Sequence, residues 1–155
     1  MELLLWRHAE AVDLPERGGD MQRELTPLGR QQAKQVAHWL APRLAPHTRI
    51  LVSPALRTQQ TARALTDQFT ILHEIGTGGY PEDILRVTGW PDAKGMTLVV
   101  GHQPTLGALA SLLLTGHAAG WEVKKGALWW FKARRGESLL RAVISPDLCD
   151  APDVK

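Results

Sequence analysis

Two short apolar runs in this chain each end on a histidine. Residues 2–6 lead into Arg7 and His8, and residues 97–100 lead, after one glycine, into His102. Runs of this length and composition are typical of strands in a parallel sheet. Because the carboxyl ends of parallel strands meet at one edge of a sheet, the two imidazoles are expected to lie together over a crevice. The pattern therefore predicts an α/β fold with both histidines in one site.

A third apolar run, residues 50–52, ends at Ser53 and Pro54, and Arg57 follows. Serine before proline is a helix-start signal, so Arg57 is expected one turn into a helix whose amino-terminal amides face the crevice. Helix amino termini favour anions. Taken alone, this segment also fits a capping Ser53 and a surface ion pair of Arg57.

Helical spacing fills the segments between the predicted strands. Helices are expected over about 27–41, from Ser53 and Pro54 to about Gln68, after Pro81, and from Pro104 to Gly116. Residues 127–131 and 138–144 then predict an antiparallel hairpin at one side of the sheet. Trp129 and Trp130, adjacent on that first strand, must point to opposite faces. This pattern predicts a three-layer α/β/α sandwich with a mostly parallel, mixed sheet.

Size and charge limit the function classes. A chain of 155 residues has the common size of one domain, so we expect a single domain over residues 1–155. The net charge is +2 without a basic run that would favour nucleic acid or a membrane as partner, and Lys124–Lys125 and Arg134–Arg135 are interpreted as hairpin-turn charges. The single cysteine, Cys149, fits a reducing compartment. Without a recognisable signal peptide or a long apolar stretch, the protein is expected to be soluble and cytoplasmic.

The residues at the strand ends suit phosphoryl transfer. Arg7 and Arg57 carry planar guanidinium groups matched to phosphate oxygens. A neutral ring nitrogen of His8 can attack phosphorus, and cations beside it would lower its pKa. His102 is suited to stabilise the equatorial oxygens. The remaining histidines are interpreted as surface or core groups: His38, His47, His73 and His117.

Four blocks of the chain resemble motifs of the histidine phosphatase superfamily. Residues 5–10 (LWRHAE) resemble its RHG motif, and residues 53–61 (SPALRTQQT) resemble its S-P-x-x-R-A-x-Q-T block. Residues 100–106 (VGHQPTL) are similar to its G-H-N-P-x-L block, and residues 23–29 (RELTPLG) to its R-x-L-T-x-x-G stretch. The four blocks occur in the family's order and spacing.

The resemblance is closest to the small SixA-type phosphohistidine phosphatases and implies a phosphoglycerate mutase-like fold without a cap domain. It implies that His8 is the nucleophile and that Arg7, Arg57 and His102 form the phosphate pocket, with Ser53 among the phosphate-binding residues. It also implies that no metal or organic cofactor is needed.

Three residues depart from the family motifs: Ala9 replaces glycine, Thr58 replaces alanine and Gln103 replaces asparagine. None of them removes a charged pocket group, so they concern the fine geometry.

The substrate depends on whether a general acid is present. Phosphomonoester hydrolysis in this family usually needs a carboxylic acid from the region after the second helix, where the chain offers Glu74, Glu82 and Asp83. Glu82 is the candidate general acid. A carboxylate at a helix start is also favoured by the helix dipole, without any catalytic role. When phosphohistidine is hydrolysed, the leaving group is an imidazole, which is far less basic than an alkoxide. A weak or absent general acid therefore lowers the rate less. The segment between Thr66 and Met96 is too short for a lid domain, so the pocket is expected to be open.

We therefore predict a phosphohistidine phosphatase that acts on a phosphotransfer-type protein through a covalent phosphohistidine intermediate, with a role in signal transduction. One alternative is a phosphatase of small phosphomonoesters, and another is a non-catalytic, phosphate-dependent binding module. A metal site on His8 and His102 lacks nearby carboxylate or cysteine ligands. The sequence specifies neither the partner protein nor the oligomeric state.

Overall fold

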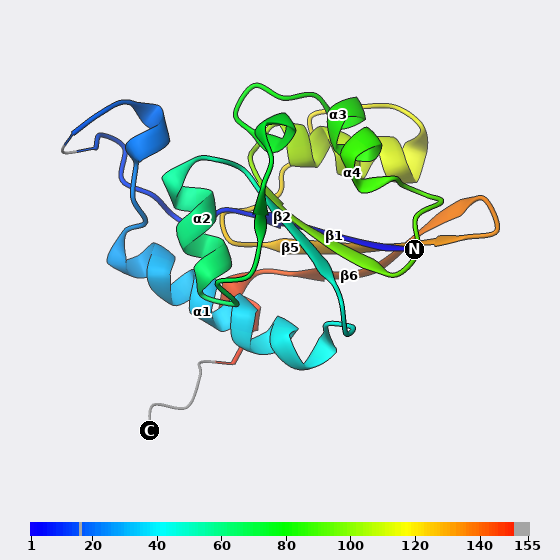
Figure 1. Cartoon of the computed structure of the whole chain (residues 1–155), viewed down its shortest axis with the longest axis horizontal. Helices are drawn as coiled ribbons and strands as arrows, with labels where there is room; N and C mark the ends of the chain where they lie inside the picture. Colours follow the sequence, from blue (N-terminus) through cyan, green and yellow to red (C-terminus); the bar gives the residue numbers. More distant parts are fainter. Residues whose placement is uncertain (16, 151–155) are drawn as a thin grey trace.

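A six-stranded mixed sheet forms the centre of the protein in the computed structural model, which describes residues 1–15 and 17–150 (Figure 1). The strands, in chain order, are β1 (Glu2–Arg7), β2 (Arg49–Val52), β3 (Thr70–Ile71), β4 (Met96–Gly101), β5 (Leu128–Arg134) and β6 (Glu137–Ile144). Their order across the sheet is β3-β2-β4-β1-β5-β6. The first four strands pair in parallel, and β5 and β6 pair antiparallel. The predicted mixed sheet is confirmed.

Helices cover both faces of this sheet (Figure 1). On one face α1 (Pro27–Leu40) and α2 (Leu56–Arg63) contribute Leu40 and Ala62 to a core that includes Trp6. On the other face α3 (Pro81–Thr88) and α4 (Thr105–Thr115) contribute to a core that includes Leu5. Alternate residues of β1 thus enter opposite cores, and the protein has the expected three layers.

The start of α1 follows its sequence signals. The Thr26 hydroxyl accepts a hydrogen bond from the Gly29 amide at 3.0 Å, and Pro27 occupies the first helical position. A Cβ atom at Gly29 would lie 1.9 Å from the Glu10 carbonyl oxygen. Glycine therefore lets α1 approach the chain that follows β1.

The predicted span of α2 is wrong at both ends. The helix covers only Leu56–Arg63, and its N-cap is Ala55 rather than Ser53. The Ser53 hydroxyl accepts the Ala55 amide at 3.2 Å, in the turn before the helix. At the other end, the Thr66 hydroxyl accepts the Gln68 amide at 3.0 Å, a local bond that competes with helix continuation.

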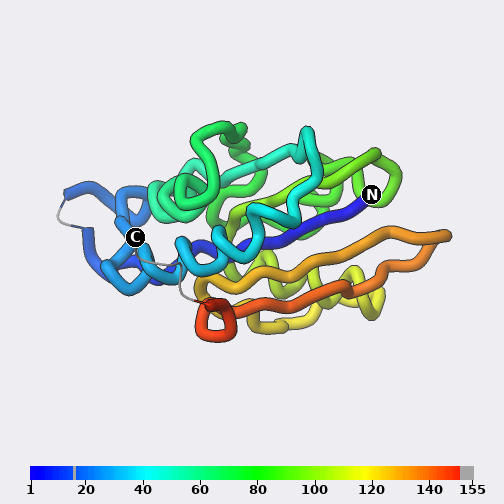
Figure 2. The backbone as a smooth tube through the Cα atoms, turned by 90° about the horizontal axis from the view of Figure 1, so that it is seen from below, coloured from blue at the N-terminus to red at the C-terminus, as the bar shows by residue number. Residues whose placement is uncertain are grey.

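The β5–β6 hairpin extends from one end of the molecule, opposite the loop that precedes α1 (Figure 2). Arg135 and Gly136 have φ values of 49° and 78°, as a two-residue hairpin turn requires, so the Arg134–Arg135 pair does lie at a hairpin turn. Trp129 and Trp130 belong to the cores on opposite faces of the sheet, as expected. In the described residues, no helix combines the length and the apolar character that crossing a membrane requires.

Candidate active site

The ends of β1, β2 and β4 bring the two histidines and Ser53 together. Arg7 pairs with Gly101, and Val52 pairs with Val100, so the next residue along each strand leaves the sheet at the same edge. The ring centroids of His8 and His102 lie 5.4 Å apart. Both side chains are buried. The strand pattern thus located the two imidazoles correctly.

The hydrogen bond of His8 fixes its tautomer. Its Nδ1 atom lies 2.7 Å from the Ala9 carbonyl oxygen. Because a carbonyl oxygen only accepts, Nδ1 must carry the proton, and in the neutral ring Nε2 keeps its lone pair. Nε2 is therefore the nitrogen of His8 that can act as a nucleophile.

His102 is held through its other nitrogen. Nε2 of His102 lies 2.7 Å from the Ser53 hydroxyl oxygen, which also accepts the Ala55 amide. Ser53 thus orients His102 rather than capping α2. Among the described residues, Nδ1 of His102 has no hydrogen-bond partner. A protonated His102 would donate from Nδ1 to an oxyanion while Nε2 donates to Ser53.

The two arginines reach this site from β1 and α2. Arg7 donates from Nη1 to the Val123 carbonyl oxygen at 2.8 Å. Arg57, almost fully buried, donates from Nη1 to the Asp20 carbonyl oxygen at 2.8 Å. Its Nη2 donates to the Asp20 carboxylate at 3.1 Å. The Nε atoms of both arginines are buried and lack partners among the described residues.

Buried donors without partners are concentrated here. In the part of the chain that the structure describes, four buried side-chain atoms lack a hydrogen-bond partner, and three belong to Arg7, Arg57 and His102. Such atoms are costly in a folded protein and need an explanation. An oxyanion bound between the arginines and the histidines would satisfy this part of the site.

Burial and positive charge keep both histidines neutral. Burial is the main cause that lowers the pKa of His8 to about 4, and Arg57 and Arg7 add to the effect, against the Ala9 hydrogen bond. The pKa of His102 is lowered to about 3, chiefly by burial and then by His8 and Arg57. The sequence predicted the direction from the arginines, whereas desolvation is the larger cause.

Asp20 is a site residue that the sequence did not reveal. It lies in the loop before α1, within the short 3₁₀ turn Asp20–Gln22. Hydrogen bonds from Arg23 and, next, Arg57 lower the pKa of its carboxyl group. In the sequence, the spacing of Asp20 and Arg23 indicates only a local ion pair. The contact of Asp20 with Arg57 joins segments 37 residues apart, so no local pattern could reveal it.

None of the three candidate acids hydrogen-bonds to the pocket residues within the described chain. Asp83 is paired with Arg86 at 3.1 Å, at the first turn of α3. Glu82 is exposed at the same helix start, and Glu74 is partly buried in the 3₁₀ turn His73–Ile75. Within the described residues, no hydrogen bond therefore links any of these three carboxylates to His8, Arg7, Arg57 or His102.

Of the three departures from the family motifs, Ala9 is a buried apolar residue, and Thr58 and Gln103 make side-chain hydrogen bonds. The Ala9 amide donates to the Thr61 hydroxyl at 3.1 Å. The Thr58 hydroxyl lies 2.9 Å from the Ser53 carbonyl oxygen, which ties α2 to the end of β2. The Gln103 amide group spans from the Trp121 carbonyl oxygen to the Gly107 amide. These residues therefore support the loops around the site.

The histidines interpreted as non-functional lie elsewhere. All four are exposed: His38, His47, His73 and His117. Within the described residues, no group of three or more His, Cys, Asp and Glu side chains is placed to hold a metal ion.

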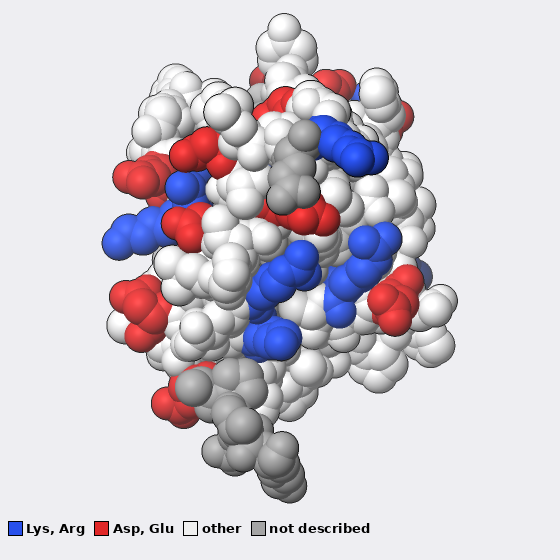
Figure 3. Space-filling model, turned by 90° about the vertical axis from the view of Figure 1, so that its left-hand side faces the viewer, with Lys and Arg blue, Asp and Glu red and all other residues white. Residues whose placement is uncertain are grey.

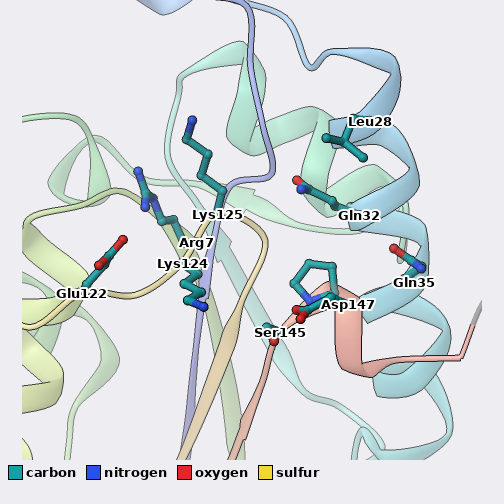
Figure 4. A pocket seen from close by; sticks show the side chains of 10 residues that line it. Arg7, Leu28, Gln32, Gln35, Glu122, Lys124, Lys125, Ser145 and Asp147 are labelled. Atoms are coloured by element: carbon teal, nitrogen blue, oxygen red, sulfur yellow. The ribbon is translucent and has the colours of Figure 1, made fainter.

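Lys124 and Lys125 do not lie at a hairpin turn, contrary to the interpretation of the sequence. They belong to the loop before β5 and line a cavity together with Arg7 and Glu122 (Figure 4). The sequence could not place the two lysines beside Arg7, because the loop and Arg7 lie far apart in the chain. They meet through the hydrogen bond from Arg7 to the Val123 carbonyl oxygen, 116 residues later.

Comparison with known proteins identifies relatives of this chain. The family described as histidine phosphatase superfamily (branch 1) matches residues 3–77. An uncharacterized protein of the cyanobacterium Picosynechococcus is 36% identical over 129 residues, which cover 76% of this chain and 77% of that protein. The phosphohistidine phosphatase SixA of Escherichia coli is 29% identical over 127 residues, covering 75% and 76% of the two chains.

Solved structures share the fold. The protein histidine phosphatase SixA, complexed with tungstate, superposes with a TM-score of 0.81 at 23% identity, covering 95% of this chain and 98% of that one. At this identity, the similarity concerns the fold.

Proposed function

The chain belongs to the histidine phosphatase superfamily and is a phosphatase, and from this premise we propose that it hydrolyses phosphohistidine on a protein substrate through a phosphorylated His8. The observation that carries the proposal is the lone pair on Nε2 of His8, next to the cluster of buried donors without partners. A neutral nucleophile and an oxyanion pocket are the two elements that phosphoryl transfer needs.

The proposed first step transfers the phosphoryl group to the enzyme. Nε2 of His8 attacks phosphorus and the bond from phosphorus to the substrate ring breaks. The substrate ring, protonated on its other nitrogen, keeps the electron pair and leaves as neutral imidazole. Arg7, Arg57 and His102 stabilise the charge on the equatorial oxygens. Binding of the anion favours the protonated form of His102, because both of its ring nitrogens then donate.

The proposed second step regenerates the enzyme. A water molecule attacks phosphorus of the phosphorylated His8, the bond from phosphorus to Nε2 breaks, and inorganic phosphate leaves with the oxygen of the water. The proton lost by the water passes to solvent or to the phosphate product. Nδ1 of His8 keeps its proton and its bond to Ala9 throughout.

Phosphohistidine is favoured over phosphomonoesters because of the leaving group. An alkoxide needs a positioned acid, and the candidates Glu74, Glu82 and Asp83 make no hydrogen bond to the described pocket residues. An imidazole that is already protonated on its other ring nitrogen departs as a neutral molecule without one. The lone cysteine, Cys149, fits a cytoplasmic location, and a phosphotransfer-type protein substrate would place the enzyme in signal transduction.

The decisive experiment compares substrates. The wild-type protein is expected to hydrolyse a phosphohistidine-bearing protein much faster than an aryl or alkyl phosphate. Glu82→Gln is expected to change phosphohistidine hydrolysis by less than about tenfold, or about 1.4 kcal/mol in the barrier. Glu74→Gln is expected to behave in the same way, since Glu74 is the other candidate glutamate in this region. Preference for alkyl phosphates, together with a large loss in either variant, would instead establish a phosphomonoesterase.

A further inference from the structure

A groove of about 480 Å³ opens beside Arg7 (Figure 4). One wall is the first half of α1, another is the segment 122–125, and the floor is formed near residues 145–147. The lining side chains used below are Arg7, Leu28, Gln32, Glu122, Lys124 and Lys125. We call this the Arg7 groove. Its volume lies in the range of about 300–1,000 Å³ that is usual for ligand sites.

The Arg7 groove is attached rigidly to the catalytic strand. The Gly126 amide donates to the His8 carbonyl oxygen at 3.0 Å, and the Trp6 indole donates to the Gly126 carbonyl oxygen at 3.0 Å. Gly126 has a φ of 75°, and a Cβ atom there would lie 2.9 Å from Cγ of Pro146. The backbone that carries Lys124 and Lys125 is therefore fixed relative to His8.

Positive charge prevails in this groove. Arg7, Lys124 and Lys125 line it, against the carboxylates of Glu122 and Asp147. In Figure 4 the side chains of Arg7 and Lys125 extend to the same side, whereas that of Lys124 turns toward Ser145 and Asp147. Both lysines are exposed, and no salt bridge within the described residues involves either of them. The ammonium group of Lys125 is therefore available to a partner, whereas that of Lys124 also faces the Asp147 carboxylate.

The surrounding face has the same character. Figure 3 views the end of the molecule at which β1, β2 and β4 finish, and basic side chains gather near its centre while most acidic ones lie toward the margin. Such a pattern attracts acidic surfaces and repels basic ones.

We propose that the Arg7 groove binds the residues of the protein substrate that flank its phosphorylated histidine, and that Lys124 and Lys125 select acidic residues there. This inference rests on the proposed function, since it assigns a binding site to residues of the proposed protein substrate. A small phosphomonoester bound at His8 has no chain to reach the two lysines. An extended peptide does, and exposed Leu28 and the Gln32 side-chain amide offer it apolar and polar contacts.

The test uses three synthetic peptides that share one phosphohistidine core. The core is flanked by aspartates, by serines or by lysines, and kcat/KM is measured for each at low salt. The wild-type protein is expected to prefer the aspartate peptide over the lysine peptide by at least about tenfold. The double variant Lys124→Glu, Lys125→Glu is expected to reverse this order. The preference of the wild type should shrink in 0.5 M salt, about five times the ionic strength at which screening acts over ~10 Å.

Lys132→Glu is the matched control. Lys132 is exposed on β5 and pairs in register with Glu2, at the far end of β1 from His8. It should keep the wild-type preference, and circular dichroism melting checks that all variants fold. Equal kcat/KM for all three peptides, or an unchanged preference in the double variant, would overturn this inference while leaving the proposed function standing. Failure to hydrolyse any of the peptides, with aryl phosphate still hydrolysed, would instead overturn the proposed function and its substrate.

Discussion

The two ends of the parallel strands use arginines in different ways. At the carboxyl ends, Arg57 is buried. Among the described residues, its side chain bonds only to Asp20 and its Nε atom has no partner. At the amino end, Arg141 lies 4.8 Å from the centre of the Trp130 ring and forms an ion pair with Glu2 at 2.8 Å. Arg57 thus keeps an N–H group free to donate to a ligand, whereas Arg141 is held by its stacking on Trp130 and its ion pair with Glu2.

The aromatic end is built for stability. Trp39 and Trp130 meet edge to face with ring centroids 6.3 Å apart, and Arg43 stacks on Trp39. A buried donor without a partner costs about 1–3 kcal/mol, whereas an aromatic pair contributes about 0.5–1.5 kcal/mol beyond its burial. Among the described residues, three of the four buried side-chain atoms without a partner lie at the catalytic end and one, Nε1 of Trp130, lies in the aromatic cluster, so the fold bears most of this cost at the catalytic end. Changes at the two ends should therefore separate activity from stability.

The variant His8→Ala is expected to show the largest difference between its effect on activity and its effect on stability. Without a nucleophile, turnover of a phosphohistidine protein should fall by about 10⁴-fold or more, as happens when the nucleophile of other covalent catalysts is removed. The free energy of unfolding should stay the same or rise, because a buried polar ring is lost. Steady-state kinetics and urea denaturation measure the two quantities. A variant that loses both activity and stability would break the proposed contrast.

The reverse separation is expected for Trp130→Ala. Removing this buried ring should lower the free energy of unfolding by about 3–5 kcal/mol. The fraction that remains folded should keep a KM close to that of the wild type, since Trp130 pairs with Leu4 in the middle of β1 and packs in the core rather than at the pocket. Denaturant midpoints and kinetics at low temperature are the measurements. A raised KM in folded protein would show that the two ends are coupled.

The pH dependence of stability should reveal the cost of the catalytic end. The folded pKa values of His8 and His102 are lowered to about 4 and about 3, below the unfolded value of 6.5. Between those values the unfolded chain binds more protons, so stability is greatest above pH 6.5 and falls as the pH decreases. At pH 5 His8 should account for a loss of about 2 kcal/mol, at 1.36 kcal/mol per pKa unit. Urea midpoints at pH 7.5 and 5 should differ less in His8→Ala than in the wild type.

The smallest effect is expected for Asp20→Asn. Asp20 is about half exposed, at 54% for its side chain, and it competes with an oxyanion for Arg57. Removing its charge should tighten tungstate binding by about three- to fivefold, the range of an ion pair worth up to about 1 kcal/mol. Calorimetric titration of both proteins with tungstate is the measurement. Weaker binding by the variant would mean that Asp20 positions Arg57 and does not compete with the ligand.

The sequence predicted the elements that depend on local patterns. The apolar runs located β1, β2 and β4, and helical spacing predicted a helix over about 27–41 where α1 spans Pro27–Leu40. The N-cap signal failed at Ser53, because the hydroxyl bonds to His102 and to a turn instead of the helix. A side chain with two potential partners cannot be assigned from its neighbours alone.

The parts that sequence analysis missed are contacts between distant segments. Asp20 and Lys125 each lie in loops whose composition indicates only exposure to solvent. The first meets Arg57 and the second lines the groove at Arg7 because the chain folds back onto the sheet edge. Only the positions of the loops in space give these residues a place near the pocket.

The hydrogen bond from Nδ1 of His8 to Ala9 also has a stereochemical consequence. Phosphohistidine exists as two isomers, which differ in the ring nitrogen that carries phosphorus. In the proposed mechanism the enzyme forms only the Nε2 isomer, whichever isomer its substrate brings, because the other nitrogen is already bonded to a backbone carbonyl. A single peptide oxygen thus makes the intermediate regiospecific, and it does so through the main chain, where no side-chain substitution can remove it.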